Sequence, residues 1–313
     1  MKVYNATRRQ IYATLRKIIS QHPFKLYQMK KELKIVFSPR CLEYQQPGHP
    51  ESPNRVVETY RFLKEKNFEF TEPAPCDEND ILSVHTKTLL EKVKTGKFFD
   101  ADTPNLPNIF YYAKLSAGGA MQAARLALTG QPAFSLMRPP GHHAGKNELG
   151  GFCYFNNLAI AIESVIKKAK RIAIVDIDAH HGQGTEEIFF DRTDVLYLSL
   201  HQVGIYPGTG LTSYKNCLNF PLLPGTGPEE YLTKLDQGLR EVKKFKAKLI
   251  AVSAGFDTYK NDPLVSLNLE LETYLEIGQK LAKLKLPLFA VLEGGYSQDL
   301  HLCIYNFCLG ISK

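Results

Sequence analysis

Short apolar runs recur along the chain, and between them lie longer segments in which an apolar residue returns every third or fourth position. The short runs are typical of strands buried on both faces of a sheet, and the longer segments of amphipathic helices. We therefore predict strands within residues 34–37, 133–137, 171–178, 195–201, 249–257 and 288–295. Helices are expected over residues 111–128, 156–169, 228–245 and 270–284. Apolar strands that alternate with helices indicate an α/β fold whose parallel sheet is covered on both faces.

Four of these strands run directly into segments rich in polar and titratable side chains. In chain order the segments are RPPGHHAG, DIDAHHG, FDTYKNDP and EGGY. In open α/β sheets the ligand site lies beyond the carboxyl ends of the strands. We therefore expect the four segments to meet at one edge of the sheet and to form one site.

Two aspartates and one histidine in these segments predict a metal site. Asp178 and His180 are two positions apart, so both side chains point the same way in an extended segment. Asp257, at the end of another strand, could complete the set. Two carboxylates, one imidazole and open coordination positions suit a catalytic Zn²⁺ or Fe²⁺. A buried salt-bridged cluster is the alternative, and the adjacent His181 is expected to be a packed, hydrogen-bonded side chain.

A second group of residues fits proton transfer. His142 and His143 lie in a Pro-Gly turn and carry imidazoles that titrate near neutral pH, although adjacent histidines also occur in surface loops. Asp176 and Gln183 flank the metal motif and could fix the two rings by hydrogen bonds. Tyr296, which follows two glycines, could donate its phenol to an oxyanion. Beside a metal that polarises a carbonyl and activates water, these groups predict amide hydrolysis.

The composition is that of an ordinary globular protein of 313 residues, 44% hydrophobic and 23% charged. No apolar run reaches the roughly 18 residues of a membrane-spanning helix. The start of the chain lacks the apolar core and small-residue cleavage site of a signal peptide. The six cysteines form no CxxC pair, which is typical of reduced thiols. We therefore expect a cytoplasmic protein.

Positive charge is concentrated at the start of the chain. The net charge is +7, but residues 1–34 hold nine Lys or Arg and one Glu, which leaves −1 for the remaining 279 residues. We expect residues 1–33 to form a basic helical extension, because apolar residues recur there at helical spacing, and residues 34–313 to form one catalytic domain. The extension could dock on the domain, contact an acidic partner or membrane surface, or act as a transit peptide. No direct binding of nucleic acid is expected.

Six ordered motifs carry a resemblance to a known family: RPPGHHA, GGFCYFNN, DIDAHHGQGT, YPGTG, AGFDTYKNDP and LEGGY. With HPESPNR at residues 49–55, they resemble the zinc-dependent histone deacetylase family, which includes bacterial acetylpolyamine amidohydrolases and acetoin-utilisation proteins. The resemblance runs from about Lys34 to the C-terminus. It implies a three-layer αβα fold of the arginase type, with a central, largely parallel eight-stranded sheet.

The resemblance also implies roles for individual residues. The zinc ligands would be Asp178, His180 and Asp257, with His142 and His143 as the tandem histidines and Tyr296 as the transition-state tyrosine. The site for acyl-lysine would be formed by Gly151, Phe152, Tyr206, Leu264 and, at the rim, Asp102, with Arg55 at an acetate exit. A structural K⁺ would be held by Asp176, Asp178, His180, Ser199 and Leu200, and a second monovalent cation could lie near Phe189 and Val195.

Several of these positions leave alternatives open. From the pattern alone, Phe152 would be a core residue and Arg55 an exposed arginine of a helix. Tyr206 stands where many members of the family have phenylalanine. Gln183 stands where class I members of the family have an acidic residue. An amide at this position resembles the pattern of the bacterial and class II members. It raises the basicity of the neighbouring ring less than a carboxylate does.

Other functions fit the sequence less well. A binuclear ureohydrolase of the arginase type needs carboxylates where Gly182 and Tyr259 stand. A non-catalytic acyl-lysine binding module is disfavoured because every catalytic position is filled. Among deacetylases, the apolar Leu264 favours acyl-lysine in a peptide or protein over acetylpolyamines, whose distal ammonium would benefit from a carboxylate at the tunnel mouth.

Overall fold

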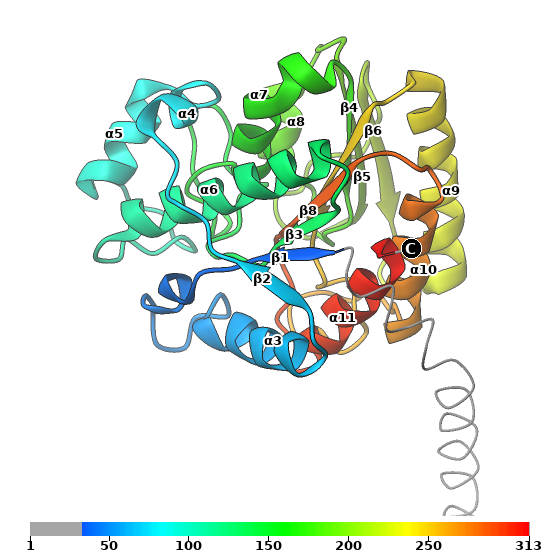
Figure 1. The fold of residues 1–313 in the computed structure, drawn as a ribbon, viewed down its shortest axis with the longest axis horizontal. Coiled ribbons are helices and arrows are strands. Elements are labelled where there is room, and N and C mark those ends of the chain that lie inside the picture. Colours follow the sequence, from blue (N-terminus) through cyan, green and yellow to red (C-terminus); the bar gives the residue numbers. More distant parts are fainter. Residues whose placement is uncertain (1–32, 313) are drawn as a thin grey trace, which may run out of the picture.

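In the part of the chain that the computed structural model describes, residues 33–312, eight strands form one sheet and every neighbouring pair is parallel (Figure 1). The order across the sheet is β2-β1-β3-β8-β7-β4-β5-β6. The strands are β1 (Lys34–Val36), β2 (Glu69–Thr71), β3 (Ala133–Ser135), β4 (Ile172–Asp176), β5 (Val195–Gln202), β6 (Cys217–Leu222), β7 (Leu249–Ala254) and β8 (Leu288–Leu292). The predicted α/β class and the eight-stranded, largely parallel sheet that the resemblance implies are both confirmed.

Helices cover both faces of the sheet, because successive residues of a strand point to opposite sides. In β4, Ala173 and Val175 pack into the core on one face, whereas Ile172 and Ile174 pack into the core on the other. The first face is covered by α3 (Pro53–Glu65), α9 (Pro228–Phe245), α10 (Leu271–Ala282) and α11 (Leu300–Ile311). The second is covered by α4 (Glu78–Leu82), α5 (Lys87–Thr95), α6 (Ile109–Leu128), α7 (Asn157–Ala169) and α8 (Gln183–Phe189).

The apolar pattern reveals the centre of this sheet and misses its edges. Six strands and α6, α7, α9 and α10 fall on the predicted segments. The two strands that the pattern does not reveal, β2 and β6, are the edge strands. Both are only partly buried, and β6 contains Pro221, so neither reads as a continuous apolar run.

The expected basic extension, residues 1–33, lies outside the described residues except for the buried Leu33. None of the helices within residues 33–312 is long and apolar enough to cross a membrane. The six cysteines are all buried free thiols, which agrees with the reduced state expected for them.

The sheet brings the four polar segments together. They follow β3, β4, β7 and β8, and these strands are neighbours in the order β3-β8-β7-β4. Since all strands are parallel, the four carboxyl ends lie side by side at one edge of the sheet, as the sequence predicts.

The close contact of α10 with α11 depends on two glycines, and it yields a test of the fold. A Cβ atom on Gly278 would lie 2.6 Å from the carbonyl oxygen of Phe307 and 2.7 Å from Cα of Gly310. We expect Gly278→Ala to lower the free energy of unfolding by about 1–3 kcal/mol through this overlap, although alanine is the better helix former. Urea denaturation measures the effect, with the exposed Glu276→Ala as the control on the same helix. Equal stability of the Gly278 variant and wild type would contradict the packing.

Candidate active site

Asp178, His180 and Asp257 converge at the carboxyl ends of β4 and β7. One ligand atom from each residue lies within 4.8 Å of the other two. Nδ1 of His180 is 2.8 Å from Oδ2 of Asp257 and 3.1 Å from Oδ1 of Asp178. The structure thus brings together the three residues that the spacing of the motifs selects as metal ligands.

Backbone N–H groups hold both carboxylates in place. The amide of Gly294 donates to Oδ2 of Asp178 at 2.7 Å, and the amide of Ala179 donates to Oδ1 of Asp257 at 2.8 Å. A Cβ atom on Gly294 would lie 2.6 Å from Asp178 and 2.7 Å from Asp257. Glycine is therefore required where the β8 loop passes over the two acids.

The charge of this cluster tests whether a cation fits. Asp176, Asp178, Asp257 and Glu293 are all at most 1% exposed, and no Lys or Arg side chain within residues 33–312 forms an ion pair with them. Buried carboxylates must be paired or bound to a metal. Two carboxylate groups and one imidazole are a donor set that zinc or ferrous iron accepts. The residues fit a divalent cation.

The electrostatics of the ligand residues reflect their crowding. Burial and the adjacent carboxylate of Asp178 raise the pKa of Asp257 to about 7. Burial opposes the charged form of His180, but its hydrogen bonds with Asp178 and Asp257 raise the pKa of the ring to about 11. Each charge is therefore strongly coupled to its neighbours in the cluster.

The two histidines of the RPPGHHAG segment lie beside the cluster, with ring centroids 4.0 Å apart. Nδ1 of His142 donates to Asp176 at 3.1 Å, and Nδ1 of His143 donates to Oε1 of Gln183 at 2.7 Å. Each ring thus has the partner that the sequence suggests. With Nδ1 as the donor, Nε2 of the neutral His143 ring carries a free lone pair.

The two rings differ in their surroundings. Burial opposes the charged form of His142, but the carboxylates of Asp178 and Asp176 raise its pKa to about 10. Burial and the neighbouring His142 and His180 lower the pKa of His143 well below its usual value. His142 is thus held as the cationic ring and His143 as the neutral one.

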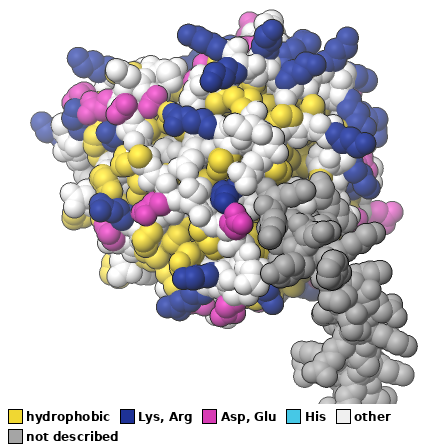
Figure 2. Space-filling view, in the orientation of Figure 1, with side chains coloured by type: hydrophobic (Ala, Val, Ile, Leu, Met, Phe, Trp, Pro, Cys, Tyr) yellow, Lys and Arg dark blue, Asp and Glu magenta, His cyan; other side chains and the backbone are white. Residues whose placement is uncertain are grey.

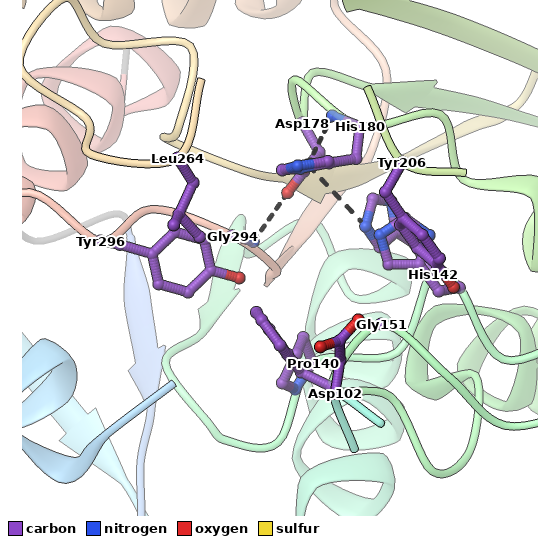
Figure 3. A pocket seen from close by; sticks show the side chains of 12 residues that line it. Asp102, Pro140, His142, Gly151, Asp178, His180, Tyr206, Leu264, Gly294 and Tyr296 are labelled. Atoms are coloured by element: carbon purple, nitrogen blue, oxygen red, sulfur yellow. Dashed lines mark hydrogen bonds and ion pairs between the residues drawn. The ribbon is translucent and has the colours of Figure 1, made fainter. Parts of the chain in front are cut away.

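A narrow cavity of about 90 Å³ leads from the surface to these groups (Figure 3). Its lining includes ten of the residues selected from the sequence, namely Asp102, His142, His143, Gly151, Phe152, Asp178, His180, Tyr206, Leu264 and Tyr296. Rings form its walls: the centroid of Tyr206 is 4.9 Å from that of His143, and the centroid of Phe152 is 5.9 Å from that of Tyr296. The walls are thus suited to an extended aliphatic chain.

The cavity wall is built from unusual backbone at Gly151 and Phe152. Both residues have a positive φ, of 55° and 70°, and such a φ is uncommon for phenylalanine. A Cβ atom on Gly151 would lie 2.5 Å from His143 and 2.9 Å from Tyr206, so the glycine keeps the passage open. Phe152 is only partly buried, and its amide donates to Thr103 at 3.0 Å. The alternative that Phe152 is a core residue is wrong.

Tyr296 closes the opposite side of the cavity, and in Figure 3 its hydroxyl points toward the centre. Burial raises the pKa of its phenol well above the usual value, so the group stays protonated and can donate. The guanidinium of Arg55 lies 4.6 Å from the centroid of the ring and donates to the carbonyl oxygens of Gly295 and Glu293, each at 2.6 Å. Arg55 is buried, so the alternative of an exposed helix arginine is wrong.

The rim of the cavity carries Leu264, which is 41% exposed, and Asp102, which is also exposed. The carboxylate of Asp262 accepts from the amide of Leu264 at 3.0 Å and from the amide of Tyr296 at 2.7 Å. One buried carboxylate therefore ties the rim to the loop of the tyrosine.

The residues expected to hold a structural K⁺ also lie together. Asp176 of β4 pairs in register with Ser199 of β5, and Leu200 follows Ser199 in the same strand. Phe189 ends α8 and Val195 begins β5. A monovalent cation at either place stays a prediction.

A model of the histone deacetylase domain matches residues 49–308. The chain belongs to the histone deacetylase family. It is 40% identical over 295 residues to a protein named "Probable deacetylase" from Archaeoglobus fulgidus, a match that covers 85% of this chain and 81% of that protein. It is 38% identical over 214 residues to acetylpolyamine amidohydrolase 2 of Pseudomonas aeruginosa, with 64% and 62% covered. The solved HD domain of HDA15 superposes with a TM-score of 0.83 at 30% identity, covering 88% of this chain and 89% of that chain.

The positions that would carry a second metal in an arginase-type enzyme have other roles in this histone deacetylase-family chain. A Cβ atom on Gly182 would lie 2.4 Å from Asp176, and the Tyr259 hydroxyl donates to Asp299 at 3.3 Å. His181 is buried and lies within hydrogen-bond distance of Thr209 and Glu186. Within residues 33–312 the candidate metal ligands form one group of three.

Sequence reasoning missed acidic residues of this deacetylase-family site. The carboxylate of Glu293 accepts from the amides of Gly141 and His142 at 2.7 and 3.1 Å, which fixes the loop of the tandem histidines, and burial raises its pKa to about 7. Glu51 forms a buried ion pair with Arg138 at 2.6 Å. An acid directly after a buried strand, as in LEGGY, was a usable signal for Glu293, whereas nothing in HPESPNR pairs Glu51 with Arg138.

Asp257→Asn tests the metal site of the deacetylase-family chain. The amide keeps the shape of the side chain but removes one of the two ligand carboxylates, so we expect the affinity for Zn²⁺ to fall by more than the 10- to 100-fold typical of outer-shell changes. The measurement is bound metal per chain by elemental analysis, together with a zinc titration. Asp236→Asn, which alters a half-buried carboxylate of α9 outside the cluster, is the matched control and should bind zinc like wild type. A full equivalent of tightly bound zinc in the Asp257 variant would exclude Asp257 as a ligand.

Proposed function

We propose that the chain is a zinc-dependent deacylase that hydrolyses the ε-amide of acetyl-lysine, or of lysine with another short acyl group, in peptides or proteins. The observation that carries this proposal is the narrow cavity walled by Phe152, Tyr206 and Tyr296, because it ends at the group formed by Asp178, His180 and Asp257. An extended aliphatic chain fits such a passage, and its amide would reach the polar end. Ferrous iron is the alternative metal.

When bound, the metal would polarise the amide carbonyl and lower the pKa of the attacking water. His143 would accept the proton of that water, because its Nδ1–H is held by Gln183 and its Nε2 is free. The same ring would pass the proton to the departing amine. His142, held by Asp176, would favour the developing negative charge through its own positive charge.

Tyr296 would donate its hydroxyl to the oxygen of the tetrahedral intermediate. Asp262 holds its backbone amide, and Arg55 lies against its ring, so both residues fix the direction of the phenol. Arg55 could also guide the acetate product, which carries the opposite charge. Asp102 at the rim could accept hydrogen bonds from the substrate backbone.

Hydrolysis of acetylpolyamines is the second candidate, supported by the similarity to an acetylpolyamine amidohydrolase. The apolar Leu264 at the rim favours acyl-lysine, because a polyamine has a second ammonium group that would gain from a carboxylate there. We further propose that a structural K⁺ supports the loop after β4 and that the protein acts in the cytoplasm.

Tyr296→Phe tests the catalytic assignment. The change removes one oxyanion donor and leaves the ring, so we expect kcat on an acetyl-lysine peptide to fall about 100- to 1,000-fold, with full metal content. Tyr214→Phe, which alters an exposed tyrosine, is the matched control. A Tyr296 variant that keeps its rate within about threefold would show that the tyrosine is structural.

Leu264→Glu tests the substrate assignment. A carboxylate at the rim should favour the distal ammonium of acetylspermidine, and an interaction of about 1–2 kcal/mol corresponds to a shift of roughly five- to thirtyfold in the kcat/KM ratio of acetylspermidine to acetyl-lysine peptide. Both substrates are measured at fixed ionic strength, with Leu264→Gln as the neutral control. If wild type already prefers acetylspermidine, the lysine assignment fails. If the glutamate leaves the ratio unchanged, Leu264 does not contact the substrate.

A further inference from the structure

Lysine and arginine side chains gather at the amino edge of the sheet, opposite the edge that carries the active site. Residues 167–171, 243–248 and 280–285 each run from the last turn of a helix toward the start of β4, β7 or β8, and none of them contains an acidic residue. With the neighbouring Arg240 they form a set that we name the basic face: Lys167, Lys168, Lys170, Arg171, Arg240, Lys243, Lys244, Lys246, Lys248, Lys280, Lys283 and Lys285. In Figure 2, Lys and Arg side chains line the upper and right-hand border, where α7 and α9 lie in Figure 1.

The three basic segments lie next to one another in space. The strands that follow them are adjacent in the order β8-β7-β4. The amide of Lys248 donates to the carbonyl oxygen of Arg171 at 2.8 Å. Between α9 and α10, a cleft of about 270 Å³ is lined by four members of the set: Arg240, Lys243, Lys280 and Lys283. The basic face is therefore one continuous surface.

Most of this charge is not neutralised by the described part of the chain. Eleven of the twelve side chains are exposed, and Lys280 is half-buried. Within residues 33–312, ion pairs join Lys280 to Asp236 and Lys244 to Glu241, and no other member of the set forms one. Cations in the last turn of a helix stabilise it through the helix dipole. Six of the twelve residues, however, lie beyond the last residue of their helix, so this effect does not account for them.

The net charge of the domain does not reveal this uneven distribution of charge. Residues 35–313 have a net charge of −1, so without the twelve residues of the basic face the rest of the domain carries −13. Residues 1–34, with a net charge of +8, join the domain at the start of β1, which is also at the amino edge because the sheet is parallel. A net charge of −1 over residues 35–313 is therefore compatible with one strongly basic surface.

We propose that the basic face binds the phosphate backbone of double-stranded nucleic acid without reading its sequence. Ten of its twelve residues are lysines, which act as point charges toward phosphate. Single strands require aromatic side chains for stacking, and insertion into a bilayer requires apolar ones. The large apolar side chains that are exposed in the described residues lie in other segments: Leu82, Phe99, Phe190, Tyr206, Leu211, Tyr214, Leu223 and Leu264. Since the face and the cavity lie at opposite edges, a bound duplex leaves the active site open.

The test is binding of the full-length protein to a fluorescent DNA duplex of about 30 base pairs, followed by anisotropy over a range of salt concentrations. The variant K168Q/K243Q/K283Q removes one exposed lysine from each segment, and K64Q/K87Q/K97Q removes three exposed lysines elsewhere as the charge-matched control. We expect wild type and control to bind alike. The face variant should lose about tenfold or more in affinity near 0.1 M salt, and its slope of log K against log salt should fall by about 2–3, since each phosphate contact contributes about 0.9. Hydrolysis of a free acetylated peptide should be unchanged in both variants.

Five results would overturn the proposal. Wild type could show no salt-dependent binding of the duplex. The control could lose as much affinity as the face variant, or the face variant could lose none, which would place any binding outside this surface. Single-stranded DNA could bind more tightly than the duplex. Vesicles with about 30% anionic phospholipid could bind wild type where DNA does not, which would identify a membrane surface as the partner.

Discussion

Four carboxylates buried together at the carboxyl edge of the sheet impose the constraint on which the rest of the structure depends. Asp176, Asp178, Asp257 and Glu293 are withdrawn from water within one cluster, where like charges repel strongly. Backbone amides and two imidazole rings form hydrogen bonds with these carboxylates, and glycines let the chain pass close to them. Asp176 and Glu293 hold the loop of the tandem histidines, whereas Asp178 and Asp257 form one group with His180. A divalent cation would balance the latter pair.

The loops at this edge of the sheet also form the walls of the cavity. The loop after β3 carries His143 and the backbone of Gly151 and Phe152, and the loop after β8 carries Tyr296. Asp262 joins the tyrosine loop to the rim, so the reacting end and the entrance are held by one set of hydrogen bonds. A parallel sheet makes this possible because every strand delivers its loop to the same edge, and it leaves the opposite edge free for the basic face.

Much of the site could be predicted from the sequence, because its metal-binding and proton-transferring side chains directly follow the apolar strands. The spacing of Asp178 and His180 and the apolar runs before them are local signals, and the structure places the third candidate ligand, Asp257, beside them. The edge strands β2 and β6 could not be predicted, because they are only partly buried and lack a continuous apolar pattern. The pairing of Glu51 with Arg138 spans 87 residues and leaves no local signal. The basic face was not predicted from the sequence, because its three segments are far apart along the chain and acidic residues elsewhere cancel their charge in the net charge of the domain.

The central claim is that one divalent cation, held by Asp178, His180 and Asp257, is required for hydrolysis of acyl-lysine. The most direct measurement is a titration of chelator-stripped wild-type protein with Zn²⁺, in which the initial rate on an acetyl-lysine peptide is followed at protein concentrations far above the dissociation constant. We expect negligible activity without metal and a linear rise that ends sharply at one equivalent of Zn²⁺. Full activity in the stripped protein, or a rise that continues to two equivalents, would contradict it.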